Sequence, residues 1–219
     1  MKTAHLALAL LALSPAASAQ PRAPTPPRPA ALTLDGLLAR FRAIPGLSAR
    51  FREEKRIQLL AAPLVSEGTL DYAAPGQMVR RTTSPAPSVA LIEGAQLRFS
   101  DGNGQQSLDM NAMPVVRQFV DSFLALVAGD RASLERAYAM EFRAPDPAAP
   151  DRWALTLRPR APALQRVFRE VVLRGEGVAL AEMVLRETSG DETVTTFRDV
   201  NAARRFSPDE RARTFRIDP

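Results

Sequence analysis

The chain has 219 residues, no cysteine and a formal net charge of +5 at pH 7. Without cysteine no disulfide can form, so stability must come from apolar packing and backbone hydrogen bonds. The charge comes almost entirely from arginines, which are spread among nearly as many carboxylates without a basic run interleaved with aromatic residues. That pattern excludes a typical nucleic-acid groove. It indicates a solvated basic surface, with an anionic head group as the alternative partner.

Residues 1–19 have the composition of a secretory signal peptide. Lys2 precedes an apolar run from Leu6 to Leu13, and residues 17–19 (ASA) offer a small-x-small cleavage site. The run is much shorter than the roughly 18–20 apolar residues that a membrane-spanning helix needs, and no cysteine follows it as a lipid-attachment site. We therefore predict export to the periplasm and a mature chain that starts after the cleavage site.

A proline-rich spacer is expected over residues 20–31, where an extended chain is favoured. The remaining residues, 32–219, are enough for a single domain with a sizeable core. This domain begins with a helix that Thr33 caps and that ends near Ile44, before a Pro-Gly pair. The apolar face of this helix consists of Leu34, Leu37, Leu38 and Phe41.

From Leu47 the apolar period changes to two, which predicts a long, half-buried strand to Leu59. Glu53 and Lys55 fall on the apolar face of this strand. Further strands are predicted over 65–72, 77–84, 88–94, 95–101, 105–110, 136–143, 152–159, 167–175, 178–188 and 192–200. Turn signals separate these strands at short intervals, which is typical of an antiparallel meander or barrel.

One helical insertion interrupts the strands. An apolar stripe from Val115 to Ala128, with Pro114 at its start, predicts a helix. A further helical turn is expected over residues 131–135. The last segment, 206–217, is expected to form a loop and a closing edge strand.

The residue types needed for most catalysis are missing. The single histidine, His5, lies in the predicted signal peptide, so the mature chain has no imidazole and no thiol. This excludes Ser-His-Asp and Cys-His constellations and the usual zinc sites. Two carboxylates could still act as in glycosidases, but Glu53 and Glu54 are adjacent in a strand and point to opposite faces. Asp109, Asp121 and Asp130 are expected as helix caps or surface groups; we expect no cofactor, no metal and no enzymatic activity.

The apolar face of the predicted sheet needs a cover, and two interpretations follow. In the first, the helices complete a sealed core. In the second, the sheet curls around an apolar cavity that takes up an acyl chain, whose burial of about fourteen CH2 groups would supply roughly 11 kcal/mol. Composition alone leaves both open.

Three segments resemble the LolA family of periplasmic lipoprotein carriers, in this order and at similar spacing: 51–55 (FREEK), 68–76 (GTLDYAAPG) and 91–99 (LIEGAQLRF). The resemblance implies an α+β fold, an incomplete antiparallel β-barrel of about ten to eleven strands with a helical lid over a hydrophobic cavity. It also implies acylated cargo (a lipoprotein, glycolipid or other lipid), an inner-membrane exporter and an outer-membrane acceptor. Family members that carry lipoproteins have a lid-bonding arginine where this chain has Ala74, so the chain resembles a divergent member.

Arg80 and Arg81 are the candidates to replace that arginine. The predicted cavity lining consists of apolar side chains from both halves of the sheet and from the 115–128 helix. These are Phe51, Leu70, Leu91, Leu97, Phe99, Phe119, Phe123, Leu124, Val127, Trp153, Leu155, Val171, Leu173, Met183 and Leu185. A monomer is expected. Two alternatives stay open: a periplasmic sensing or scaffold module of the same fold that binds a protein partner, and a carboxylate-dependent envelope hydrolase.

Overall fold

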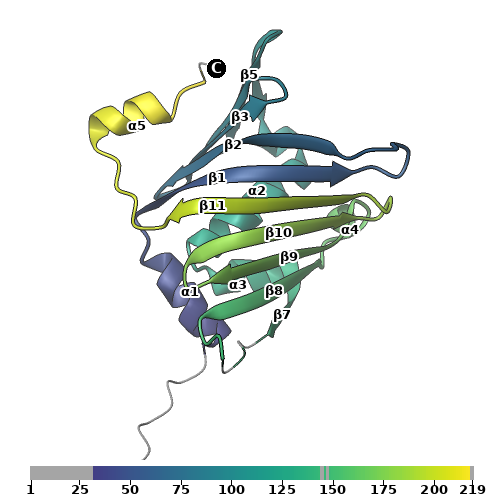
Figure 1. Cartoon of the computed structure of the whole chain (residues 1–219), viewed down its shortest axis with the longest axis vertical. Coiled ribbons are helices and arrows are strands. Elements are labelled where there is room, and N and C mark those ends of the chain that lie inside the picture. The colour runs from purple at the N-terminus through teal and green to yellow at the C-terminus, as the bar shows by residue number, and fades with distance from the viewer. Residues whose placement is uncertain (1–31, 144–145, 147, 218–219) are drawn as a thin grey trace, which may run out of the picture.

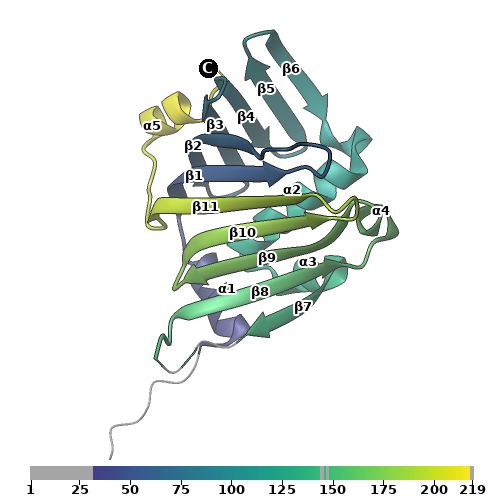
Figure 2. The same ribbon diagram turned by 45° about the vertical axis from the view of Figure 1, so that its right-hand side comes forward.

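The computed structural model describes residues 32–143, 146 and 148–217, so the predicted signal peptide and proline-rich spacer lie outside the described residues. Eleven strands form one antiparallel sheet in the order β6-β5-β4-β3-β2-β1-β11-β10-β9-β8-β7 (Figures 1 and 2). The pairing of β1 with β11 joins the N-terminal and C-terminal halves of the sheet. The sheet curves without closing, because β6 and β7 remain separate edges. The predicted α+β fold, an incomplete barrel with a helical lid over its concave face, is confirmed.

The elements follow one another as a meander. The strands are β1 (Gly46–Arg56), β2 (Leu64–Ala73), β3 (Gln77–Ser84), β4 (Ser88–Glu93), β5 (Gln96–Asp101), β6 (Gly104–Asp109), β7 (Tyr138–Arg143), β8 (Arg152–Pro159), β9 (Phe168–Glu176), β10 (Ala179–Glu187) and β11 (Glu192–Asn201). The helices are α1 (Leu34–Arg42), the 3-10 turn η1 (Met110–Ala112), α2 (Pro114–Val127), α3 (Arg131–Ala137), α4 (Pro162–Gln165) and α5 (Pro208–Thr214).

Helices α1 and α2 cover the inner, concave face of the sheet, and both begin as predicted. The Thr33 hydroxyl accepts a hydrogen bond from the Gly36 N–H at 3.1 Å and caps α1. Pro114 occupies the first turn of α2, where its missing N–H is not needed. The two helices approach closely at Gly129, whose φ is +62° and where a Cβ would lie 2.2 Å from the Leu38 carbonyl oxygen. Only glycine fits this position.

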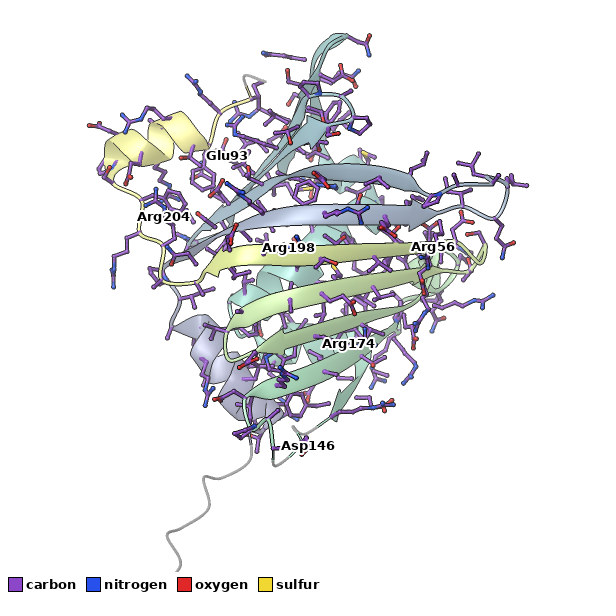
Figure 3. All side chains as sticks on the ribbon, viewed as in Figure 1. Arg56, Glu93, Asp146, Arg174, Arg198 and Arg204 are labelled. Atoms are coloured by element: carbon purple, nitrogen blue, oxygen red, sulfur yellow. The ribbon has the colours of Figure 1, made fainter. Side chains whose placement is uncertain are left out.

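The main core lies between these helices and the inner face. Its buried members come from α1, α2 and both halves of the sheet, and include Leu37, Leu38, Phe41, Leu47, Leu126, Leu155 and Leu173. The outer face carries charges instead, some labelled in Figure 3. Ion pairs cross several strands there: Arg158 with Glu170 at 3.3 Å, Arg186 with Glu170 at 2.6 Å and Arg186 with Glu192 at 3.0 Å. This face is therefore solvated over the C-terminal half of the sheet.

The prediction for residues 206–217 was wrong, because they form α5 and not a closing edge strand. Ser207 and Glu210 make a reciprocal capping box that starts a helix at this point. Phe215 then packs against Val79 and Leu91 on the outer face, in a second small core. The Arg81 guanidinium donates hydrogen bonds to the carbonyl oxygens of Thr214 and Arg216 at 2.7 and 2.8 Å, which holds the end of the helix.

Two strand boundaries differ from prediction by two or more residues, and the others agree to within one residue. Strand β1 ends at Arg56, not at Leu59, because pairing with β2 stops at Lys55 and Leu64 and Pro63 has no N–H to donate. Helix α3 extends to Ala137, so β7 starts at Tyr138 and not at residue 136. The short elements η1 and α4 were not predicted. Among the described residues, no helix is both long and apolar enough to cross a membrane.

Candidate functional site

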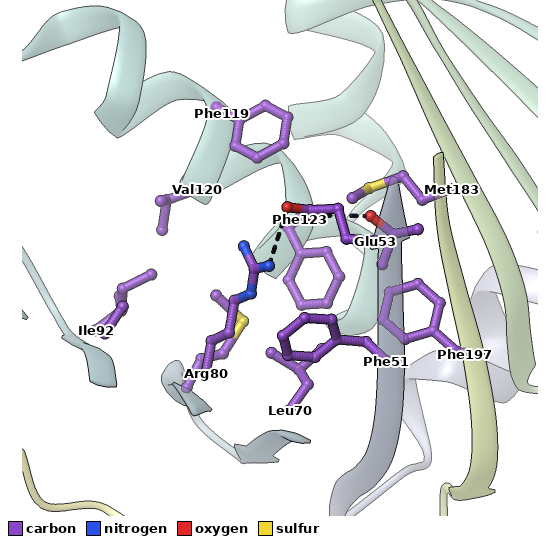
Figure 4. A pocket seen from close by; sticks show the side chains of 13 residues that line it. Phe51, Glu53, Leu70, Arg80, Ile92, Phe119, Val120, Phe123, Met183 and Phe197 are labelled. Atoms are coloured by element: carbon purple, nitrogen blue, oxygen red, sulfur yellow. Dashed lines mark hydrogen bonds and ion pairs between the residues drawn. The ribbon is translucent and has the colours of Figure 1, made fainter. Parts of the chain in front are cut away.

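An apolar cavity of about 180 Å³ lies between the inner face of the sheet and α2 (Figure 4). It is lined by Phe51, Glu53, Leu70, Met78, Arg80, Ala90, Ile92, Phe119, Val120, Phe123, Met183, Thr195 and Phe197. These residues come from β1–β4, β10, β11 and α2, so both halves of the sheet contribute. Phe123 also lines two smaller hollows, of about 20 and 30 Å³, elsewhere along α2. Phe123 therefore borders all three spaces.

Helix α2 presents Phe119 and Phe123 to the cavity because residues four apart share a helix face. The Phe119 ring packs on Phe168 of β9, with ring centroids 5.7 Å apart. Beside it, Ser122 hydrogen-bonds with the Tyr138 hydroxyl of β7, and burial raises the pKa of Tyr138. These two contacts add to the packing of Leu126 in the main core, and together they attach α2 to the C-terminal half of the sheet.

One polar group of residues interrupts the apolar lining. The Arg80 guanidinium donates a hydrogen bond to the Glu53 carboxylate at 3.0 Å, and the Thr195 hydroxyl donates to the second Glu53 oxygen at 3.1 Å. The same guanidinium lies 4.2 Å from the centroid of the Phe51 ring, within cation–π range. The Arg80 and Glu53 side chains are 37% and 22% exposed. The cavity therefore contains a partly desolvated ion pair in which both charges have partners.

The structure distinguishes the two candidate arginines. Arg80 and Arg81 are adjacent in β3, so their side chains leave opposite faces of the sheet. Arg80 enters the cavity, whereas Arg81 holds α5 on the outer face. Among the described residues, the Arg80 guanidinium donates hydrogen bonds to Glu53 on β1 and Ser66 on β2, and not to α2.

A family model described as "Outer membrane lipoprotein carrier protein LolA-like" matches residues 26–212. The chain belongs to this family. The match covers every cavity-lining residue and every strand of the sheet. A search among curated proteins finds no match.

Several solved structures are similar to this LolA-like chain at low identity. A LolA superfamily protein from Nitrosomonas europaea is 13% identical with a TM-score of 0.45, covering 83% of this chain and 97% of that one. MucB in the MucA/MucB complex of Pseudomonas aeruginosa is 13% identical at 0.48, covering 80% and 59%. The Mycobacterium tuberculosis lipoprotein LppX is 10% identical at 0.41, covering 75% and 94%.

The structure places the predicted lining residues in several different surroundings. Phe51, Leu70, Phe119, Phe123 and Met183 line the main cavity, and Val127, Val171 and Leu173 line the smaller hollows. Leu97 and Leu124 pack against the neighbouring cluster of Ile92, Met110 and Val120. Trp153, Leu155 and Leu185 belong to the main core, and half-buried Phe99 lies opposite Ala90 on the inner face.

Leu91 is misplaced in the prediction, because it lies on the outer face against Phe215 while its neighbour Ile92 lines the cavity. A shift of one residue along a strand moves a side chain to the opposite face. Trp153 is held away from the cavity. Its ring meets Phe41 edge-to-face at 5.9 Å, and its indole N–H donates to the Gly177 carbonyl oxygen at 2.9 Å.

Several lining residues were not predicted, namely Glu53, Met78, Arg80, Ala90, Ile92, Val120, Thr195 and Phe197. Glu53 gave a usable signal, because it stands among apolar residues in the period-two pattern of β1. A charged residue on an apolar strand face indicates a polar partner nearby.

The three aspartates expected as caps or surface groups occupy such positions. Asp109 accepts a hydrogen bond from the Asn111 N–H at 2.9 Å, and Asp130 accepts one from the Ser133 N–H at 3.1 Å. Asp121 pairs with Arg117 at 2.8 Å on the exposed side of α2. Within the described ranges, no group of three or more potential metal ligands is found.

Proposed function

We propose that this LolA-like chain is a periplasmic carrier that binds an acyl chain of a lipoprotein or another lipid in the cavity beneath α2. It would move this cargo from an inner-membrane exporter toward an outer-membrane acceptor. The observation that supports the proposal is the apolar cavity itself, which both halves of the sheet and α2 build together. Binding would rest on burial of apolar surface, without a catalytic step.

The size of the cavity indicates how cargo would enter. A space of about 180 Å³ is close to that of an engineered protein cavity of about 150 Å³ that binds benzene. It therefore accommodates a short part of an acyl chain while α2 stays in place. A longer chain needs α2 to move outward, or Phe123 to rotate and join the three hollows. Burying about fourteen CH2 groups at ~0.8 kcal/mol each would offset the loss of such helix contacts.

The ion pair offers a place for the polar end of the cargo. Arg80 has five N–H donors, more than its hydrogen bonds to Glu53 and Ser66 use. We propose that the remaining donors contact an ester or carboxylate oxygen while the acyl chain lies along Phe119 and Phe123. The lipid would then have a defined direction in the cavity.

The test is native mass spectrometry of the chain purified from the periplasm of an expressing cell, followed by identification of extracted lipid. We expect a bound acylated species at about one per chain. Phe123→Asp puts a charge among the apolar lining residues and should abolish this species while circular dichroism shows a folded protein. The matched control is Gln118→Asp, on the same helix but in the groove between α2 and α3; it should retain lipid.

Two results would contradict the proposal. If no lipid is found and added fatty acids and lipopeptides also fail to bind, the sensing or scaffold module becomes the better explanation. If lipid is consumed, and turnover disappears when Glu53 is replaced by Gln, the chain acts as a hydrolase.

A further inference from the structure

Exposed large apolar side chains gather at one place, the tip of the β1–β2 hairpin. Leu59, Leu60, Leu64 and Val65 are 94%, 46%, 53% and 37% exposed. Elsewhere in the described residues only Met113, at 37%, belongs to this class. The tip also contains Ala61, Ala62 and Pro63, all exposed, so seven consecutive residues carry no polar side chain. An apolar stretch of this kind in contact with water indicates a binding surface.

This apolar loop, residues 59–65, projects from the edge of the sheet that the strand ends form, which is distinct from the edge strands β6 and β7. It lies beside the β10–β11 turn and α4 (Figure 1). Its base is held there, because the Gln58 N–H donates a hydrogen bond to Asp191 at 3.1 Å. Strand pairing places Leu64 opposite Lys55 and Ser66 opposite Glu53. Leu64 therefore lies on the inner face of the sheet, one row beyond the polar group of the cavity, and connects the cavity row to the loop.

Cations lie at the same edge of the sheet. Arg160, Arg166 and Arg169 flank α4, and all three are exposed. Within the described part of the chain none of them forms an ion pair, although Arg169 donates to the Thr188 carbonyl oxygen at 3.3 Å.

Most carboxylates nearby are neutralised: Glu187 pairs with Lys55 at 3.1 Å, and Glu192 with Arg186 at 3.0 Å. The edge thus combines a projecting apolar loop with unpaired arginines.

We propose that this edge binds the surface of a phospholipid bilayer that contains anionic lipid. Leucines at an interface bury themselves at the boundary between head groups and acyl chains, and each nearby cation adds attraction to anionic lipid. The loop projects from the sheet and carries no polar side chain for the directional hydrogen bonds of a protein interface, whereas interfacial water can satisfy its backbone. The inference goes beyond the proposed function because it names a membrane contact. It rests on the proposed function only in one respect, namely the reason why the protein would contact a membrane.

The test is vesicle flotation of the exported chain, with its intact mass verified so that residues 1–19 do not contribute. The wild-type chain should float with phosphatidylethanolamine–phosphatidylglycerol vesicles and bind phosphatidylcholine vesicles more weakly. The triple variant Leu59→Ser, Leu60→Ser, Leu64→Ser should bind the anionic vesicles at least about tenfold more weakly. Since these side chains are exposed, folding should be unaffected. Met113→Ser, which removes an exposed apolar side chain elsewhere, is the matched control and should bind normally.

The arginines are tested separately by the double variant Arg166→Glu, Arg169→Glu, which should lower binding to anionic vesicles but not to phosphatidylcholine vesicles.

The inference is overturned if the wild-type chain binds neither vesicle type, if the triple variant floats normally, or if the loop only cross-links to a protein partner. Binding of a fluorescent fatty acid by the same variants separates this from the proposed function. Loss of vesicle binding with intact fatty-acid binding concerns the loop, and the reverse concerns the cavity.

Discussion

Truncation of Phe123 to alanine tests whether the space beneath α2 accepts lipid. Removing a buried phenylalanine ring costs about 3–5 kcal/mol. Phe123 is only half-buried and borders three hollows, so its ring makes fewer packing contacts than a core ring does. We expect Phe123→Ala to lower the free energy of unfolding by about 2 kcal/mol.

The same truncation should improve binding. It joins the hollows of about 180, 20 and 30 Å³ into one longer apolar space. If two more CH2 groups of a fatty acid become buried at ~0.8 kcal/mol each, the affinity rises about tenfold. A carrier cavity thus predicts a less stable protein that binds its ligand more tightly.

Urea unfolding followed by circular dichroism measures the stability, and displacement of a fluorescent fatty acid measures the affinity. Leu155→Ala is the control, because Leu155 is fully buried in the main core and lines none of the three hollows. It should lower the free energy of unfolding by about 2–5 kcal/mol without changing the affinity of the folded protein. The reasoning is refuted if Phe123→Ala loses about 3–5 kcal/mol and binds no fatty acid, since the core is then sealed.

Three further outcomes are expected. Glu53→Gln leaves the Arg80 cation without its carboxylate and should lower the free energy of unfolding by about 1–3 kcal/mol. Replacing both members of the pair, as in the double variant Glu53→Leu, Arg80→Met, should recover most of the lost free energy, because the two effects are coupled. Phe215→Ala should cost about 3 kcal/mol and speed proteolysis of α5, yet leave fatty-acid binding unchanged, because Phe215 lies on the outer face. Hydrogen bonds from the Ser133 hydroxyl and N–H lower the pKa of Asp130 in the folded chain. The stability from this cap is therefore present above the ordinary aspartate pKa and is lost as the pH falls through the folded value; urea midpoints measured down to about pH 3 should show a shallower loss for Asp130→Asn.

The strand faces could be predicted where polar and apolar residues alternate, and could not where both neighbours are apolar. In β1, arginines on either side of Phe51 indicate which face is buried, and Phe51 does line the cavity. In β4, Leu91 and Ile92 are both apolar, because α2 covers one face and α5 covers the other. The missing information was α5, which was expected as a strand. A second cover over part of the outer face removes the alternation that sets the register.

The end of β1 shows a second limit. Alternation continues through Ile57 and Leu59 although the strand ends at Arg56, so the pattern placed Leu59 in the core when it is the most exposed large apolar residue described. The period-two pattern predicts only which side chains would share a face if the strand continued. It does not predict whether a partner strand is present, and therefore does not predict where the strand ends.

The Arg80–Glu53 pair bears on whether the cavity is a site or an imperfection of packing. Replacing a buried ion pair by apolar residues of similar size is often neutral or stabilising, so such a pair adds little to a sealed core. Here, Thr195, Ser66 and the Phe51 ring satisfy both charges while the remaining lining is mostly apolar. A cavity that only filled space would gain nothing from this arrangement. If the cavity takes up and releases a lipid with one polar end, Arg80 provides a fixed contact for that end. Replacing Arg80 removes this contact. The preference of the double variant for fatty acids over uncharged alkanes should therefore fall, even though its stability is restored.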